Sequence, residues 1–396
     1  MDLEKHSRRR FLLKSGLGLA GLPFAFAACA SARDSKPDKS YMVYVGTYAT
    51  ADAPGIFGYR LNANTGALKR ELVMPGGPNP SFLILDKERR NLYAVNEVGE
   101  FNGTKTGAVS TFAVNQNTGD LTLISQHPTL GANPCYLSVD QENRFLFVAN
   151  YSGGNVAVFP IQTTGEVGPA VDMDQHIGKG PHKNQDGAHA HCIVPDPGEK
   201  FWFSADLGID QVIGYTLSRA TGQLSPGRRA FTTRAGAGPR ILTFHPSGRF
   251  AYLICELNST MYVLAYNAYK GSFRELQMVT TLPAAYEGTS YCAHVVVSAD
   301  GRFLYGSNRG HNSLVVYAID PETGQLTLVE HVGVRGDWPR HFTLDPTGQV
   351  LLVANQRSNN IATFQVNQKT GKLTFTGHTA EVPAPACLQV VPGFKK

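Results

Sequence analysis

The sequence repeats one pattern of apolar and polar positions six times. Each copy has a short apolar run, a turn that starts with a polar residue, and a second apolar run that ends beside polar residues. The turns recur 47 to 56 residues apart, starting at Asp86, Asp140, Asp196, His245, Ser298 and Asp345. Short apolar runs bounded by turn residues are typical of β-strands. The pattern therefore predicts an all-β chain built from a repeated pair of antiparallel strands.

A seventh copy is divided between the two ends of the chain. Residues 386–391 have the pattern of the first strand, and residues 41–48 have the pattern of the second. A repeat length of about 40 to 50 residues is typical of propeller blades, and pairing the two end segments would leave no free sheet edge. We expect a seven-bladed β-propeller, closed by its N-terminal and C-terminal strands. A closed ring of this kind is expected to be a monomer.

The first residues differ from the rest of the chain. Residues 7–14 are basic and are followed by the apolar stretch 16–28, which is too short to span a bilayer but has the length of a signal-peptide core. The paired arginines followed by Phe11 and Leu12 resemble a twin-arginine export signal. We expect a periplasmic or extracellular protein. The predicted divisions are a signal peptide (1–32), a linker (33–40) and the propeller (41–396).

Cleavage of the leader has two interpretations. It could follow Ala32, or it could precede Cys29 in a segment that resembles a lipoprotein box. Membrane attachment is expected only if a lipid is added at Cys29. Removal of the leader would also lower the net charge from +5 to about +2, so no affinity for nucleic acid is expected.

The cysteines indicate free thiols. The chain has 6 cysteines, of which Cys29 lies in the leader, and the others are odd in number and include no CxxC spacing. We expect buried free cysteines and no disulfide framework.

Candidate functional residues follow from the repeat. Because the two strands of a hairpin are antiparallel, the start of the first strand and the end of the second lie at the same end, so all seven open ends face one side of the ring. At these positions blades three to six carry His191, Arg240, Glu256, Arg309 and Arg340, and blade one carries Glu97. These side chains suit an anionic or polar substrate. The alternative is that they form inter-blade salt bridges, such as Arg240 with Glu256.

The sequence lacks the usual hydrolase motifs, including the Gly-x-Ser-x-Gly elbow and the His-Glu-x-x-His zinc motif. His189 and His191 have the spacing of two residues on one side of a strand, as a metal pair needs. No clear third ligand accompanies them, so we expect no metal and favour His191 as a satisfied or catalytic histidine.

Seven short motifs together resemble the seven-bladed propeller lactonase family, which includes 6-phosphogluconolactonases and a fungal carboxy-cis,cis-muconate cyclase. They are Gly187–His191, Ala205–Gly208, Gly238–Pro246, Cys255–Leu257, Ser307–His311, Trp338–Arg340 and Ala354–Gln356. The resemblance covers residues 41–392 and implies a propeller lactonase, and the leader makes it an exported member of the family. It places the family's pocket residues on His191, Arg240, Glu256 and Arg309. One departure is Ala293-His294, where relatives often carry Ala-Glu.

The function implied is hydrolysis of a sugar-acid lactone. Ester opening needs an activated water, a stabilised oxyanion and a proton for the leaving alkoxide. Glu256 or His191 would act as general base or acid, and Arg240 and Arg309 would hold the oxyanion. No cofactor is required.

Substrate binding is expected to involve Arg340, His189 and Glu97. An exported enzyme would more plausibly meet gluconolactone than 6-phosphogluconolactone, although the sequence does not separate the two. Two alternatives stay open, namely a cycloisomerase of the carboxymuconate type and a non-catalytic propeller that binds a ligand or partner through the same rim.

Overall fold

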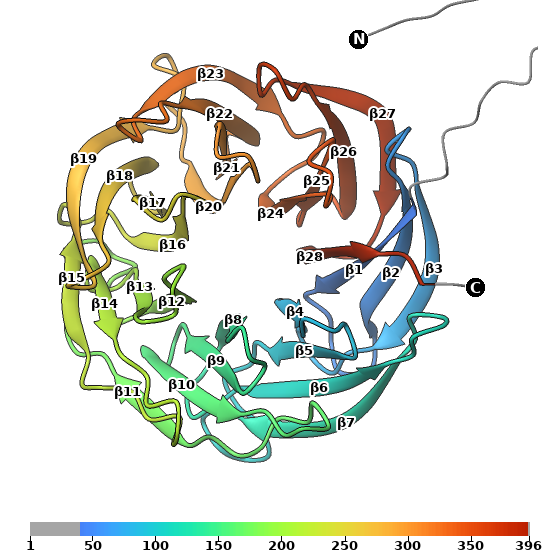
Figure 1. Cartoon of the computed structure of the whole chain (residues 1–396). Helices are drawn as coiled ribbons and strands as arrows, with labels where there is room; N and C mark the ends of the chain where they lie inside the picture. Colours follow the sequence, from blue (N-terminus) through green and yellow to red (C-terminus); the bar gives the residue numbers. More distant parts are fainter. Residues whose placement is uncertain (1–39, 395–396) are drawn as a thin grey trace, which may run out of the picture. The chain divides into compact units, whose positions relative to one another are not determined.

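The computed structural model describes residues 40–394 as a ring of seven four-stranded sheets (Figure 1). Every regular element in this range is a strand, and neighbouring strands within each sheet are antiparallel. The all-β, seven-bladed propeller predicted from the sequence is confirmed. The predicted signal peptide and nearly all of the predicted linker lie outside the described residues.

Blades 1 to 3 follow the chain from the innermost strand outward. Blade 1 contains β4 (Leu83–Leu85), β5 (Asn91–Asn96), β6 (Ala108–Val114) and β7 (Leu121–Pro128). Blade 2 contains β8 (Pro134–Val139), β9 (Phe145–Asn150), β10 (Asn155–Pro160) and β11 (Asp172–Gln175). Blade 3 contains β12 (Ala190–Pro195), β13 (Trp202–Asp206), β14 (Gln211–Tyr215) and β15 (Arg228–Thr232).

Blades 4 to 6 repeat this order. Blade 4 contains β16 (Pro239–Phe244), β17 (Phe250–Cys255), β18 (Thr260–Asn267) and β19 (Ser272–Thr280). Blade 5 contains β20 (Tyr291–Val297), β21 (Phe303–Arg309), β22 (Ser313–Ile319) and β23 (Leu326–Gly333). Blade 6 contains β24 (Pro339–Leu344), β25 (Val350–Asn355), β26 (Asn360–Val366) and β27 (Leu373–Glu381).

Blade 7 is the seam. Its innermost strand is the C-terminal β28 (Pro385–Pro392), which pairs with β1 (Ser40–Thr47), followed by β2 (Pro54–Asn62) and β3 (Leu68–Pro75). Tyr41 lies opposite Pro392 and Gly46 lies opposite Cys387. The two ends of the chain therefore share one sheet, as predicted, and the ring closes through backbone hydrogen bonds.

The core lies between the blades. The second strand of each blade is apolar on both faces because both faces pack on neighbouring sheets, and every residue of β5, β9, β17 and β25 is buried. A buried tyrosine on this strand often locks one blade to the next. Tyr93 of blade 1, for example, donates its hydroxyl hydrogen to the Gly165 carbonyl of blade 2, 2.9 Å away.

Five cysteines lie in the described residues, and all of them are buried free thiols. The prediction of free cysteines holds for this part of the chain. No helix in residues 40–394 has the length and apolar character needed to cross a bilayer.

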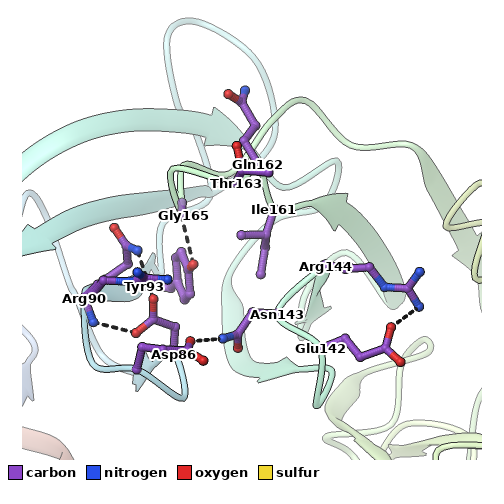
Figure 2. A pocket seen from close by; sticks show the side chains of 12 residues that line it. Asp86, Arg90, Tyr93, Glu142, Asn143, Arg144, Ile161, Gln162, Thr163 and Gly165 are labelled. Carbon is purple, nitrogen blue, oxygen red and sulfur yellow. Dashed lines mark hydrogen bonds and ion pairs between the residues drawn. The ribbon is translucent and has the colours of Figure 1, made fainter.

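One surface pocket, of about 280 Å³, lies between blades 1 and 2 at the turn ends of the hairpins (Figure 2). The backbone N–H of Arg90 donates to Asp86, and Glu142 forms an ion pair with Arg144. This pocket is at the opposite end of the hairpins from the predicted rim residues. Its charged groups form hydrogen bonds within the turns and ion pairs with one another.

Candidate functional site

A β-bulge in the innermost strand positions the predicted side chains. In β12, Ala190 lies opposite Asp206 and Cys192 lies opposite Ala205, so His191 is an additional residue in the ladder. Arg240 in β16 and Arg340 in β24 occupy the same bulged position. A bulge changes the direction in which a side chain points. Here it brings these side chains to the wall of one cavity at the centre of the ring.

That central cavity is small. Every blade except blade 5 contributes to its wall the residue that occupies the position equivalent to His191. These residues are Ser81, Cys135, His191, Arg240, Arg340 and Ala386. The remaining wall is formed by Phe82, Tyr136, Ile241, His294 and His341. The sequence prediction that the open ends of the hairpins converge is therefore confirmed.

Glu256 joins two of the predicted arginines. Its Oε2 atom lies 2.9 Å from Nε of Arg240 and 2.8 Å from Nη2 of Arg309. Arg240 and Glu256 belong to the same blade, whereas Arg309 belongs to the next one. The salt bridge of Arg240 with Glu256 that the alternative interpretation named is present, but it lies within one blade, and it is Arg309 that pairs with Glu256 between blades.

The backbone also holds both guanidinium groups. Nη1 of Arg240 donates to the carbonyl oxygen of Ala293, and Nη2 of Arg309 donates to that of Cys292 at 3.0 Å. Within residues 40–394, Nη2 of Arg240 and Nη1 of Arg309 have no hydrogen-bond partner. Each arginine therefore keeps one nitrogen available for a ligand.

The charges of this cluster are stable at neutral pH. Burial alone would raise the pKa of Glu256, but Arg309 and Arg240 outweigh burial and hold that pKa below its usual value. Burial, with Arg309 nearby, lowers the pKa of Arg240 to about 10. Glu256 is therefore ionised at pH 7, and Arg240 remains protonated.

A second charged cluster contains Arg340 and Glu97. Nη2 of Arg340 lies 3.5 Å from Oε2 of Glu97, and its guanidinium carbon lies 5.0 Å from the centre of the Tyr48 ring. Tyr48 donates its hydroxyl hydrogen to the same Glu97 oxygen at 2.7 Å, and Ser81 also donates to it. Burial alone would lower the pKa of Arg340, but Tyr48 and Glu97 raise it above its usual value.

His191 is the neutral member of the site. Its side chain is buried, and burial together with Arg240 and Arg340 holds its pKa well below the usual value. Nδ1 lies 3.6 Å from Sγ of Cys135, and the ring packs edge-on against Tyr151. In the described part of the chain Nε2 has no hydrogen-bond partner. The ring can therefore accept a proton from a water or a substrate.

His189 has a different environment from His191. Its ring stacks on Tyr151, with Nε2 2.9 Å from Oδ1 of Asp186 and Nδ1 3.1 Å from the Tyr151 carbonyl oxygen. Like Glu97, Glu256 and Arg309, it is absent from the wall of the small central cavity. Among residues 40–394, no group of three His, Cys, Asp or Glu side chains could hold a metal ion.

Sequence reasoning missed part of the wall. His294 and His341 each follow a bulged position by one residue, and their rings stack with centres 4.1 Å apart. Burial lowers the pKa of His341 to about 3 and that of His294 well below its usual value, so both are neutral. The repeat could have identified both residues, because they directly follow Ala293 and Arg340. Trp338, whose ring centre is 5.3 Å from the Arg309 guanidinium, belongs to the Trp338–Arg340 motif but was not selected as a site residue.

The site carries an excess of positive charge. Three guanidinium groups face two carboxylates, and His191 is neutral. All of these side chains are largely buried, so water screens their charges only weakly. The arrangement suits a ligand on which negative charge is present or develops.

Comparison with known proteins identifies the family. The model of the family "Lactonase, 7-bladed beta-propeller" matches residues 42–390. A 6-phosphogluconolactonase of Bacillus subtilis is 36% identical over 307 residues, which cover 77% of this chain and 85% of that protein. The chain therefore belongs to the seven-bladed β-propeller lactonase family, and lactone hydrolysis is the class of activity that this membership supports.

Solved structures agree. The periplasmic gluconolactonase of Pseudomonas aeruginosa is 36% identical with a TM-score of 0.83, and the alignment covers 89% of this chain and 99% of that one. A protein from Lactobacillus plantarum is 32% identical with a TM-score of 0.82, over 89% of this chain and 99% of that one.

Proposed function

We propose that this protein hydrolyses a sugar-acid lactone at the rim of the ring, where the open ends of the hairpins converge beside His191, and that glucono-1,5-lactone is a substrate. The observation that carries the proposal is the neutral His191 ring in a cavity wall that it shares with Arg240 and Arg340. Ester hydrolysis needs a proton acceptor beside preorganised cationic donors, because an oxyanion forms as water attacks the carbonyl.

His191 is the better candidate for the general base. Glu256 is ionised, but its Oε2 atom already accepts hydrogen bonds from two guanidinium groups, which reduces its affinity for a proton. In the described part of the chain Nε2 of His191 accepts no hydrogen bond, so a water molecule can bind to it directly. We assign Glu256 the role of holding Arg240 and Arg309 in place.

The proposed reaction follows from these positions. His191 takes a proton from water as the water oxygen bonds to the lactone carbonyl carbon, and the free nitrogens of Arg240 and Arg309 donate to the oxyanion. The ring C–O bond then breaks, and the leaving oxygen receives the proton from His191. The product is a hydroxy acid, which releases one proton to solution at neutral pH. Arg340 and Glu97 would hold hydroxyl groups of the sugar acid.

We also propose that the protein is exported. The basic and apolar pattern of residues 7–28 supports this, and one relative, the Pseudomonas aeruginosa protein, is itself described as a periplasmic gluconolactonase. An unphosphorylated lactone fits that location, since it could be formed by sugar oxidation outside the cytoplasm.

The test is proton release at constant pH by residues 33–396, with glucono-1,5-lactone and 6-phosphoglucono-1,5-lactone as separate substrates. The proposal expects a rate above spontaneous hydrolysis with the unphosphorylated lactone and its loss in Arg240→Ala. Activity on the phosphorylated lactone alone would refute the proposed substrate. Background rates on both, from folded protein, would refute lactone hydrolysis and make muconate cyclisation the next assay.

A further inference from the structure

Blade 3, which carries His191, differs from blades 4, 6 and 7 in how its innermost strand is anchored. In blades 4, 6 and 7 a side chain of the preceding blade accepts the backbone N–H two residues before the bulged residue. The pairs are Asp210 with Gly238 at 2.8 Å, Asn312 with Trp338 at 2.9 Å, and Asn359 with Ala384 at 2.8 Å. The corresponding residue before blade 3 is Gly154, which has no side chain to offer.

Gly154 cannot be replaced by a larger residue at this place. It has a φ of +62°, and a Cβ built on it would lie 2.5 Å from the carbonyl oxygen of Ala188. The segment that leads into β12 therefore lies directly against the Gly154 backbone. The N–H of His189 consequently needs a different acceptor.

Asp206 is that acceptor. Its Oδ1 atom accepts the N–H of His189 at 2.7 Å and that of Gly208 at 2.9 Å. Four other blades have an asparagine at this position, and its amide donates to a backbone carbonyl of the loop that precedes the blade. In blade 2, for example, Asn150 donates to the carbonyl of Thr129 at 2.8 Å. A carboxylate cannot make that bond, because it has no hydrogen to donate.

His176 supplies the missing donor. It occupies the same loop position as Thr129. The backbone N–H of each donates to the carbonyl of the glycine directly before the third strand of its sheet, Gly107 for Thr129 and Gly154 for His176. Its Nδ1 lies 2.6 Å from Oδ2 of Asp206, and its Nε2 lies 2.6 Å from the hydroxyl oxygen of Tyr215. The Asn-to-Asp change and the Thr-to-His change are therefore complementary.

Both ring nitrogens of His176 have hydrogen-bond partners. The Tyr215 hydroxyl donates its one hydrogen to Oδ2 of Asp174 at 2.9 Å, so its oxygen accepts from Nε2 of His176. Oδ2 of Asp206 accepts from Nδ1. Both ring nitrogens of His176 therefore face oxygen acceptors, an arrangement that an imidazolium paired with Asp206 would satisfy. Asp206 is fully buried and His176 nearly so.

We infer that Asp206 and His176 are positioning residues for the proposed base, so this inference rests on the proposed function of His191. Asp206 fixes the N–H of His189, and the carbonyl of His189 accepts the N–H of Leu207 at 2.9 Å. The chain is thus held on both sides of residue 189 just before the bulge at His191. The His189 ring also stacks on Tyr151, whose ring packs against His191. Displacing this anchor would displace the His191 ring.

The repeat itself provides the test. The double variant His176→Thr with Asp206→Asn reproduces the Thr129 and Asn150 pair of blade 2, so it should fold. It replaces the carboxylate that accepts the His189 and Gly208 N–H groups by an amide, and in the described part of the chain the oxygen of the equivalent Asn150 in blade 2 accepts no hydrogen bond. We expect kcat for glucono-1,5-lactone to fall about 10- to 100-fold with KM changed less than about twofold, since small displacements of a reacting group have effects of this size. A wild-type kcat in the folded double variant would overturn the inference.

A conservative variant separates positioning from stability. His176→Asn keeps a donor near the place of Nδ1 but loses the bond to Tyr215, so we expect a lower melting temperature with kcat near that of the wild type. His176→Thr alone should lower both the melting temperature and kcat. A wild-type kcat in His176→Thr would overturn the inference.

A spectroscopic measurement does not depend on any variant folding. In ¹⁵N-labelled wild-type protein at pH 7, the ring of His176 should show hydrogen on both nitrogens, and a neutral ring would overturn the charged pair. If wild-type protein lacks lactone hydrolysis, the proposed function fails instead, and if His191→Gln retains it, His191 is not the base and the positioning role fails with that assignment. Loss of kcat in His191→Gln with full kcat in the double variant would contradict the positioning role alone.

Discussion

Replacing Glu256 by glutamine should destabilise the protein and remove its activity together. The side chain keeps its shape but loses the negative charge that lies 2.9 Å from Nε of Arg240 and 2.8 Å from Nη2 of Arg309. Both guanidinium groups are at least 94% buried, so their charges would remain with little solvent to compensate them. Removal of one partner from a buried pair costs about 3 to 5 kcal/mol.

The loss should be visible as a lower melting temperature. A large domain loses about 2 °C per kcal/mol, so Glu256→Gln should melt about 6 to 10 °C below the wild type at pH 7. Glu287 is an exposed glutamate, and Glu287→Gln is the matched control, expected to stay within about 1 °C. Proton release from glucono-1,5-lactone would be measured on the same samples, below both melting temperatures. We expect a fall in kcat of about 100-fold or more, since two oxyanion donors lose their support.

Acid pH provides an internal check on the cause. Arg309 and Arg240 outweigh burial and hold the folded pKa of Glu256 below the unfolded value of about 4.3. The stabilisation is therefore complete above about pH 4.3 and is lost as the pH falls through the lower folded pKa. The difference in melting temperature between wild type and Glu256→Gln should shrink over that range. A variant with unchanged melting temperature and unchanged kcat would refute the role assigned to this carboxylate.

Three further outcomes are expected. His191→Gln should lower kcat by about 10²- to 10⁴-fold while its melting temperature changes little, measured by proton release and thermal unfolding; near-normal kcat would return the role of base to Glu256. Arg240→Gln removes a cation that depresses the pKa of His191, so the acid limb of its kcat/KM profile should move to higher pH, and a shift to lower pH would contradict this electrostatic account. Arg8→Lys with Arg9→Lys should keep the protein in the cytoplasm on fractionation, and unchanged export would exclude the twin-arginine route.

The sequence predicted the fold and the location of the charged residues because both depend on the repeat. Hairpin geometry places the start of one strand beside the end of the next, and this was enough to select Arg240 and Glu256 as neighbours. It did not predict the bulge at His191, because an additional residue in a ladder changes the register without changing the apolar pattern. The bulge is also why the spacing of His189 and His191 did not describe their environments.

Contacts between blades could not be predicted from the sequence either. Glu256 reaches Arg309 across a blade boundary, and Glu97 accepts hydrogen bonds from Tyr48 and Ser81, which come from different blades. Such contacts depend on the direction of side chains from strands far apart in sequence. The pairing of His176 with Asp206 has a weak signal in the repeat, since Asp206 stands where four blades carry asparagine.

Arg240 and Arg309 link the two requirements of the proposed reaction, which are removal of a proton from water and stabilisation of the oxyanion. In the resting site they act with burial to hold the pKa of His191 well below its usual value, so the ring is neutral and cannot block the site with a charge. A base with so low a pKa would be weak if that environment were constant. When an oxyanion forms beside Arg240 and Arg309, its negative charge offsets part of their positive field, and the proton affinity of His191 rises as the proton arrives. The excess positive charge of the site therefore stabilises the oxyanion directly and strengthens the base only when the oxyanion is present, which favours the transition state over the bound lactone.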